Sequence, residues 1–261
     1  MIRLIASDLD GTLLLNGAQS LRPETTGLIQ KLTRQGRIFA AASGRQYANL
    51  RRLFKGVEEE IAYICENGSL VIYQGKILEK HIIPRETGQE ILKAMMEKDG
   101  AEALLSGVDT CYIQAKDPGY AVHLRDVVKN NVTEVEDILK TTEPYLKISV
   151  YEKAGVDKSQ AYWKERFGDR VTVVTSGNAW LDTMPKGVDK GSAIHTLMEK
   201  LGITPEETLV LGDNFNDIEM MDAVKYSFAM EKAASEVKAH CRYETALVED
   251  TLREILGGKS D

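Results

Sequence analysis

The sequence has few of the residues on which disulfide frameworks and zinc sites depend. It contains three cysteines, Cys65, Cys111 and Cys241, and four histidines. The cysteines are odd in number and far apart, and no pair of histidines lies at the spacing of metal ligands. We therefore expect the cysteines to be small buried side chains in a reducing compartment, and we expect no zinc site.

The chain also lacks long apolar runs and an excess of basic residues. No segment approaches the length of a membrane span, and the apolar stretch after Met1 is too short for a signal peptide. Its 33 lysines and arginines against 40 aspartates and glutamates give a net charge of -7, which counts against nucleic acid as a partner. We expect a cytoplasmic protein with no membrane partner, and nothing in the sequence indicates its oligomeric state. An anionic substrate would need a cation or local positive charge in the site.

What is present is a pattern of alternating strands and helices. Apolar runs predict strands over Ile2–Ser7, Arg37–Ala42 and Ile61–Cys65. Helical spacing of apolar residues separates them over Pro23–Gln35 and Tyr47–Phe54. This order is typical of a parallel sheet with helices on its faces.

The pattern changes in the middle of the chain and then returns. A hairpin is predicted over residues 69–83, followed by helices mixed with short strands, including a helix near Val132–Lys140. From Lys190 the strand and helix alternation resumes. We therefore predict an α/β core made of residues 1–83 and 185–261, interrupted by an inserted α+β domain over residues 84–184.

Acidic residues follow two of the predicted core strands. Asp8 and Asp10 are two residues apart, so in an extended segment both side chains leave the same face. Two carboxylates held together repel unless a cation neutralises them. A third carboxylate from Asp213 would complete an oxygen-rich site suited to Mg²⁺.

A plainer interpretation is that these residues are caps. An aspartate at the end of a strand is often only a helix or turn cap, and Asp-Gly is a common turn. Taken singly, the groups at Asp8 and Asp10, at Ser43, and at Asp213 favour that interpretation. Taken together, each after its own apolar strand, they favour a site at the carboxyl ends of the strands.

A carboxylate can attack phosphorus and leave an acyl phosphate that water later cleaves. The phosphoryl oxygens must then be held by cationic or N–H donors. Ser43 and the Gly44 N–H lie at a strand-to-helix turn, which suits phosphate. Lys190 could bring positive charge; Lys186 is its rival, but the position of Lys190 before Gly191 and a helix start favours it.

Five segments match the motifs of one known family, in the family's order. They are Asp8-Leu9-Asp10-Gly11-Thr12-Leu13-Leu14, Ala42-Ser43-Gly44-Arg45, Glu66-Asn67-Gly68, Gly187-Val188-Asp189-Lys190-Gly191 and Gly212-Asp213-Asn214-Phe215-Asn216-Asp217. In these segments the chain resembles the haloacid dehalogenase superfamily, and within it the Cof-type phosphatases with a C2B cap. The resemblance implies a Rossmann-like core with a cap that closes over it.

The resemblance also implies a role for each matching residue. Asp8 would be the nucleophile and a magnesium ligand. Asp10 would protonate the leaving oxygen and then activate water, while its backbone carbonyl binds Mg²⁺. Asp213 would ligate Mg²⁺, and Asp217 would support that ligand. The phosphate would be held by the Leu9 N–H, Ser43, Gly44, Lys190 and Asn216.

The expected activity is Mg²⁺-dependent hydrolysis of a small phosphorylated metabolite, either a sugar phosphate or a phosphorylated cofactor. Two alternatives remain open from the sequence. One is a phosphomutase, which returns the phosphoryl group to its substrate, and the other is a sensor that binds a phosphorylated ligand without turnover. No residue of the predicted cap is assigned to the site; Tyr112, His123 and Trp180 are interpreted as packing.

Overall fold

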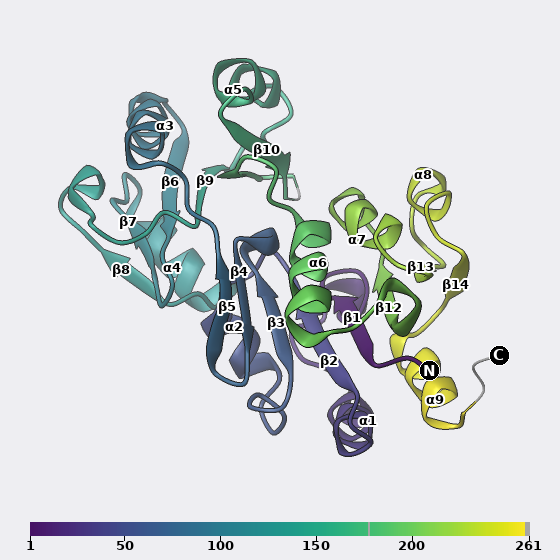
Figure 1. Cartoon of the computed structure of the whole chain (residues 1–261). Helices are drawn as coiled ribbons and strands as arrows, with labels where there is room; N and C mark the ends of the chain where they lie inside the picture. Colours follow the sequence, from purple (N-terminus) through teal and green to yellow (C-terminus); the bar gives the residue numbers. More distant parts are fainter. Residues whose placement is uncertain (177, 259–261) are drawn as a thin grey trace. The chain divides into compact units, whose positions relative to one another are not determined.

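The computed structural model of the chain describes residues 1–176 and 178–258 (Figure 1). Residues 177 and 259–261, which fall within the ranges predicted for the inserted domain and the core, lie outside this description. The chain divides into two compact units. The first unit is Met1–Ser43, Leu50–Glu79 and Asp189–Asp261, and the second unit is Gly44–Asn49 and Lys80–Val188.

The first unit contains an eight-stranded sheet in the order β14-β13-β12-β1-β2-β3-β4-β5. Its strands from β14 to β3 are parallel, and β4 turns back antiparallel to β3. Every residue of β1 is buried, as expected for a strand with both faces covered. The strands are β1 (Leu4–Asp8), β2 (Ile38–Ala42), β3 (Ala62–Cys65), β4 (Leu70–Tyr73), β5 (Lys76–Lys80), β12 (Thr208–Gly212), β13 (Tyr226–Met230) and β14 (Tyr243–Thr245).

Helices cover both faces of this sheet, as predicted. In Figure 1, α6, α7 and α8 lie on one face and α1 and α9 on the other. The longest of the first group begins at Lys190 because Asp189 caps it with a reciprocal bond to Ser192, and it ends at Gly202, whose φ is 60°. The helices are α1 (Pro23–Arg34), α6 (Lys190–Leu201), α7 (Ile218–Asp222), α8 (Ser235–Lys238) and α9 (Val248–Leu256), with short helical turns η1 (Leu15–Gly17), η2 (Glu66–Gly68), η5 (Pro205–Glu207) and η6 (Phe215–Asp217). The residues of α2 (Tyr47–Leu53) are divided between the two units.

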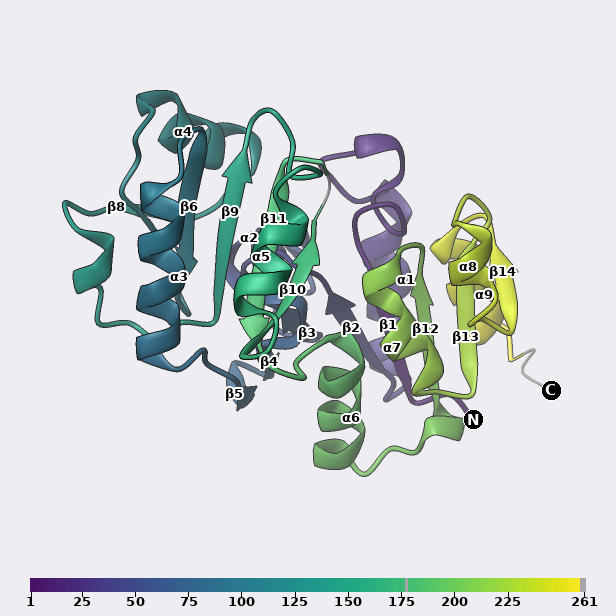
Figure 2. The same cartoon turned by 90° about the horizontal axis from the view of Figure 1, so that it is seen from above.

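The second unit contains a six-stranded sheet in the order β10-β11-β9-β6-β7-β8. All its pairs are antiparallel except β7 with β8. Helices α3 and α5 cover one face and build its main core, as Figure 2 shows. The elements are β6 (Ala101–Ser106), β7 (Cys111–Ile113), β8 (Val132–Glu134), β9 (Lys147–Glu152), β10 (Val171–Thr175), β11 (Trp180–Pro185), α3 (Arg85–Glu97), α4 (Pro118–Val122), α5 (Gln160–Phe167), η3 (His123–Val127) and η4 (Ile138–Lys140).

The helix predicted near Val132–Lys140 is wrong. Residues 132–134 form β8, which pairs in parallel with β7, and only the short turn η4 follows, capped by Asp137. The segment crosses between two clusters, because Val132 packs with the residues around α4 and Ile138 lies in the core under α3. Strand pairing and this crossing override the helical spacing of its apolar residues.

Within the described parts of the chain, no helix combines the length and the apolar character that crossing a bilayer requires.

Candidate active site

Three carboxylates from two distant parts of the chain meet at the carboxyl end of the first unit's sheet. Asp8 is the last residue of β1, and Asp213 directly follows the neighbouring strand β12. After β1 the chain builds the sheet toward β2, whereas after β12 it builds toward β13, so these two strands flank the point where ligands bind in open α/β sheets. One carboxylate oxygen each from Asp8, Asp213 and Asp217 lie within 4.8 Å of one another.

Lys190 joins these acids from the start of α6. Its Nζ donates to Asp8 Oδ1 at 2.5 Å and to Asp217 Oδ1 at 2.7 Å, and the side chain is 1% exposed. The other oxygen of Asp217 accepts the backbone N–H groups of Asp213 and Asn214, both at 3.0 Å. Asp217 therefore fixes both the ammonium and the loop that carries Asp213. Lys186, the rival in the sequence, instead donates to the Gly168 carbonyl.

Burial and like charges shape the acid–base properties of this group. Burial raises the pKa of Asp8 well above its usual value; the Lys190 ammonium opposes that shift, and Asp217 and Asp213 add to it. Burial also raises the pKa of Asp213, against a hydrogen bond from Thr12. For Lys190, burial alone would lower the pKa, but the carboxylates of Asp217 and Asp8 together raise it.

The group therefore has more carboxylates than cations. Three acids share one ammonium, and such an excess of buried negative charge is relieved by a cation. Asp8 and Asp213 offer hard oxygen donors, and Thr12 holds Asp213 Oδ1 by a hydrogen bond of 2.7 Å. This donor set fits Mg²⁺, which takes carboxylate oxygens together with water or phosphate oxygens.

A tight turn follows Asp8 and carries Asp10. The Leu9 carbonyl accepts the N–H groups of Thr12 at 3.2 Å and Leu14 at 2.7 Å, and Leu9 itself is fully buried. Gly11 has a φ of 100°, and a Cβ placed there would lie 2.1 Å from Asp213 Oδ2. Only glycine fits this close approach. The Asp10 side chain is exposed at this turn, and the carboxylate group formed by the described residues does not include it.

Ser43 lies at the end of β2, and Asn216 lies in the loop after β12 that also carries Asp213. Ser43 follows Ala42, the register partner of Asp8, and is 2% exposed. Asn216 is half-buried in η6, three residues after Asp213. Gly44 is grouped with the second unit, where its carbonyl accepts from Lys147 Nζ at 2.8 Å.

Two residues in contact with this site were not assigned a role from the sequence. Thr12 bonds Asp213, and Asn67 bonds both Ser43, through its N–H at 3.0 Å, and Asn216, through its Oδ1 at 3.3 Å. Both belong to segments that match the family's motifs, and this match is the signal in the sequence that points to them. Their contacts depend on where distant loops meet, which one sequence does not show.

In the second unit, His123 and Trp180 belong to a cluster of rings with Tyr120 and Tyr151. The Tyr151 ring lies 4.8 Å from Trp180, 5.3 Å from His123 and 5.5 Å from Tyr120, measured between ring centroids. Tyr120 belongs to the smaller core beside α4, and Tyr151 and Trp180 pack against that core. The contacts agree with the interpretation of His123 and Trp180 as packing residues.

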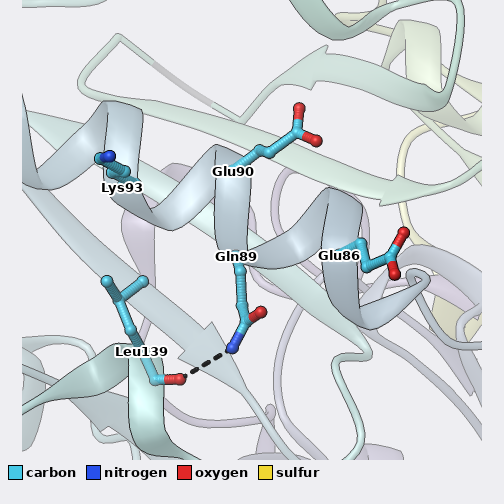
Figure 3. A pocket seen from close by; sticks show the side chains of 5 residues that line it. All are labelled: Glu86, Gln89, Glu90, Lys93 and Leu139. Atoms are coloured by element: carbon cyan, nitrogen blue, oxygen red, sulfur yellow. Dashed lines mark hydrogen bonds between the residues drawn. The ribbon is translucent and has the colours of Figure 1, made fainter.

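An open depression of about 490 Å³ lies on the second unit beside α3 (Figure 3). Two of its lining residues are joined by a hydrogen bond of 3.1 Å, which Gln89 Nε2 donates to the Leu139 carbonyl. Its lining carries two carboxylates, Glu86 and Glu90, and one ammonium, Lys93, and contains none of the residues predicted for the site. An open, acidic depression of this kind is a poor place for a phosphate.

Comparison with known proteins agrees with this geometry. The family model of haloacid dehalogenase-like hydrolases matches residues 5–251. The chain is 28% identical to the 5-amino-6-(5-phospho-D-ribitylamino)uracil phosphatase YbjI of Escherichia coli K12, over 93% of this chain and 90% of that protein. It is 27% identical to the HMP-PP phosphatase of Serratia proteamaculans, over 92% of this chain and 87% of that protein.

A solved structure shares the whole fold. The structure of a haloacid dehalogenase-like hydrolase from Bacteroides thetaiotaomicron matches this one with a TM-score of 0.86 at 24% sequence identity. The match covers 98% of this chain and 100% of that chain. The chain belongs to the haloacid dehalogenase-like hydrolases. Within that family it is a Cof-type phosphatase, a hydrolase that acts on phosphorylated substrates.

Proposed function

We propose that this phosphatase hydrolyses a small phosphorylated metabolite in a Mg²⁺-dependent reaction, by way of a phosphorylated Asp8. The observation that carries the proposal is the position of Asp8, which is 6% exposed, accepts a hydrogen bond from the Lys190 ammonium and has a carboxylate oxygen within 4.8 Å of one of Asp213. The hydrogen bond from Lys190 aims the Asp8 carboxylate, and the Lys190 ammonium favours its charged form, the form in which a carboxylate attacks phosphorus.

In the first step, an Asp8 carboxylate oxygen bonds to phosphorus and the bond from phosphorus to the leaving oxygen breaks. Asp10 supplies the proton that the leaving oxygen takes up, and its exposed side chain suits exchange with a substrate. Lys190, Ser43, Asn216 and the N–H groups of Leu9 and Gly44 hold the phosphoryl oxygens in the proposal. Their positive charge and N–H dipoles stabilise the charge that develops there.

In the second step, water attacks phosphorus and the bond to Asp8 breaks. Asp10 now accepts the proton of that water, so inorganic phosphate leaves and both aspartates return to their starting state. Mg²⁺, held by Asp8, Asp213 and the Asp10 carbonyl, would neutralise phosphoryl charge throughout. The bonds that Asp217 makes to Lys190 and to the Asp213 loop keep the donor groups in place.

For the substrate we propose a sugar phosphate or a phosphorylated cofactor or cofactor precursor. The support is the nature of two relatives, whose names give a phosphorylated ribitylaminouracil and HMP-PP as their substrates. Both relatives are named as phosphatases, which fits a site whose proposed ligands all bind the phosphate group.

The test is phosphate release by the purified protein with Mg²⁺ across a panel of sugar phosphates, flavin phosphates and pyridoxal phosphate. Asp8→Asn is isosteric and cannot form the acyl phosphate, so it must be inactive on every member. Asp169→Asn makes the same chemical change at an exposed position and must keep wild-type rates. Turnover that survives in Asp8→Asn would contradict the mechanism, and isomerised product in place of inorganic phosphate would indicate a mutase.

A further inference from the structure

The turn after β3 has an unusual backbone. Glu66, Asn67 and Gly68 have φ values of 51°, 55° and 109°, so three consecutive residues lie in the left-handed region. That region is unfavourable for residues with a side chain, although asparagine tolerates it better than most. The two with side chains are also buried, Glu66 at 1% and Asn67 at 3% exposure. Such strain persists where the surrounding structure holds it, and it is common at functional sites.

This turn contacts three loops that carry proposed phosphate ligands. The Asn67 N–H donates to the Ser43 carbonyl at 3.0 Å, and Asn67 Oδ1 accepts from Asn216 Nδ2 at 3.3 Å. Gly68 packs against the residue before Lys190, because a Cβ on Gly68 would lie 2.2 Å from the Asp189 carbonyl oxygen.

We propose that Asn67 is a positioning residue that orients the Asn216 carboxamide for phosphate. A carboxamide nitrogen has two N–H bonds in one plane. When one of them donates to Asn67 Oδ1, the direction of the other is fixed before substrate arrives. Donors held in this way do not need to reorganise during the reaction, which is how preorganised sites gain rate.

The inference rests on the proposed function only in taking Asn216 as a phosphate ligand. It competes with a simpler role, in which Asn67 is present because the backbone needs a residue that tolerates positive φ. The two roles separate in Asn67→Gly. Glycine accepts the left-handed backbone and keeps the N–H that bonds Ser43, but it removes the oxygen that holds Asn216.

The experiment is a double-mutant cycle of Asn67→Gly and Asn216→Ala, read as kcat/KM for acetyl phosphate and as the dissociation constant of inorganic phosphate. We expect Asn216→Ala to lower kcat/KM about tenfold, the typical effect of one hydrogen bond to a charged group, and Asn67→Gly to lower it by no more than that, because Asn67 acts only through Asn216. The double variant should be no worse than Asn216→Ala alone, because Asn67 acts through Asn216. Gln74→Gly is the matched control, since Gln74 has a φ of 50° in an exposed turn, and it should keep wild-type kinetics.

Two results would overturn the inference: wild-type kinetics in Asn67→Gly, or losses that multiply in the double variant. If Asn67→Gly does not fold, Asn67→Asp retains an acceptor oxygen and tolerance of positive φ. Asn216→Ala should then lower kcat/KM by the same factor in the Asn67→Asp background as in wild type. A smaller factor in that background would count against the proposed role of Asn67. Phosphate binding needs no turnover, so an inactive wild-type protein would refute the proposed function while the coupling could still be measured.

Discussion

Lys190 Nζ and Asp8 Oδ1 lie 2.5 Å apart although the two residues are 182 positions apart in the chain, and both side chains are buried. The pair joins the start of α6 to the end of β1. A buried ammonium is tolerated only with well-placed partners, and here Asp217 supplies the second one at 2.7 Å. The same contacts that make the charge tolerable also aim the Asp8 carboxylate.

Removing this ammonium should damage both fold and activity. Lys190→Met leaves Asp8 and Asp217 buried without their cation, which we expect to lower the free energy of unfolding by about 3–5 kcal/mol. Urea denaturation monitored by circular dichroism measures this. Lys200→Met, an exposed lysine on the same helix, should change stability by less than about 0.5 kcal/mol. Equal effects of the two substitutions would contradict the arrangement.

Gly11 should be essential for the position of Asp213. In Gly11→Ala the new Cβ would overlap Asp213 Oδ2 at 2.1 Å, so the carboxylate must move. Displacement of this size in an active site costs about a hundredfold in kcat/KM. Gly17→Ala is the matched control, because its φ is 74° and its Cβ would meet nothing within 4 Å. If Gly17→Ala loses as much activity as Gly11→Ala, backbone strain and not the contact with Asp213 is responsible.

A divalent cation should stabilise the folded protein through Asp8 and Asp213. A ligand at one hundred times its dissociation constant adds about 2.7 kcal/mol to the free energy of unfolding. We expect Mg²⁺ to raise the thermal midpoint of wild type and to lose this effect in Asp213→Asn. Asp222→Asn changes an exposed acid and should leave the Mg²⁺ effect intact. A thermal midpoint of the wild-type protein that does not change with Mg²⁺ would count against the cation site.

The Cys241 thiol should react slowly with alkylating reagents although it is partly exposed. Burial, against a hydrogen bond with Ser227, raises its pKa to about 11. The reactive thiolate should then be about two hundred times scarcer at pH 8 than for an unperturbed cysteine. Because the folded pKa lies above the pH of the experiment, the rate should rise about tenfold for each pH unit up to that value. Iodoacetamide labelling followed by peptide mass spectrometry tests this, and labelling of Cys241 at the rate of a free thiol at pH 8 would contradict it.

The sequence predicted the alternation of the core because periodicity there agrees with topology. Strands such as Leu4–Asp8 are short apolar runs with polar ends, and α1 begins at Pro23 as its position suggested. The helix predicted over residues 132–140 was wrong because strand pairing with β7 overrode the helical spacing of its apolar residues. Local pattern decides an element only where tertiary contacts agree with it.

Part of the candidate site could be predicted from the sequence for the same reason. Asp8 and Asp213 are marked by their places after apolar strands, and those strands are neighbours in the sheet. The contacts of Asn67 with Ser43 and Asn216 could not be predicted, because they depend on how three loops meet in space. The left-handed backbone of Glu66 has no signature in its residue type either.

The central claim is that Asp8 carries the phosphoryl group during turnover, and chemical trapping tests it most directly. Borohydride reduces an aspartyl-phosphate to homoserine, so a reaction quenched during turnover and digested should yield homoserine at position 8 by mass spectrometry. We predict this product only when substrate and Mg²⁺ are both present, and never in Asp8→Asn. Rapid release of phosphate with an unmodified Asp8 in every quenched sample would contradict the account.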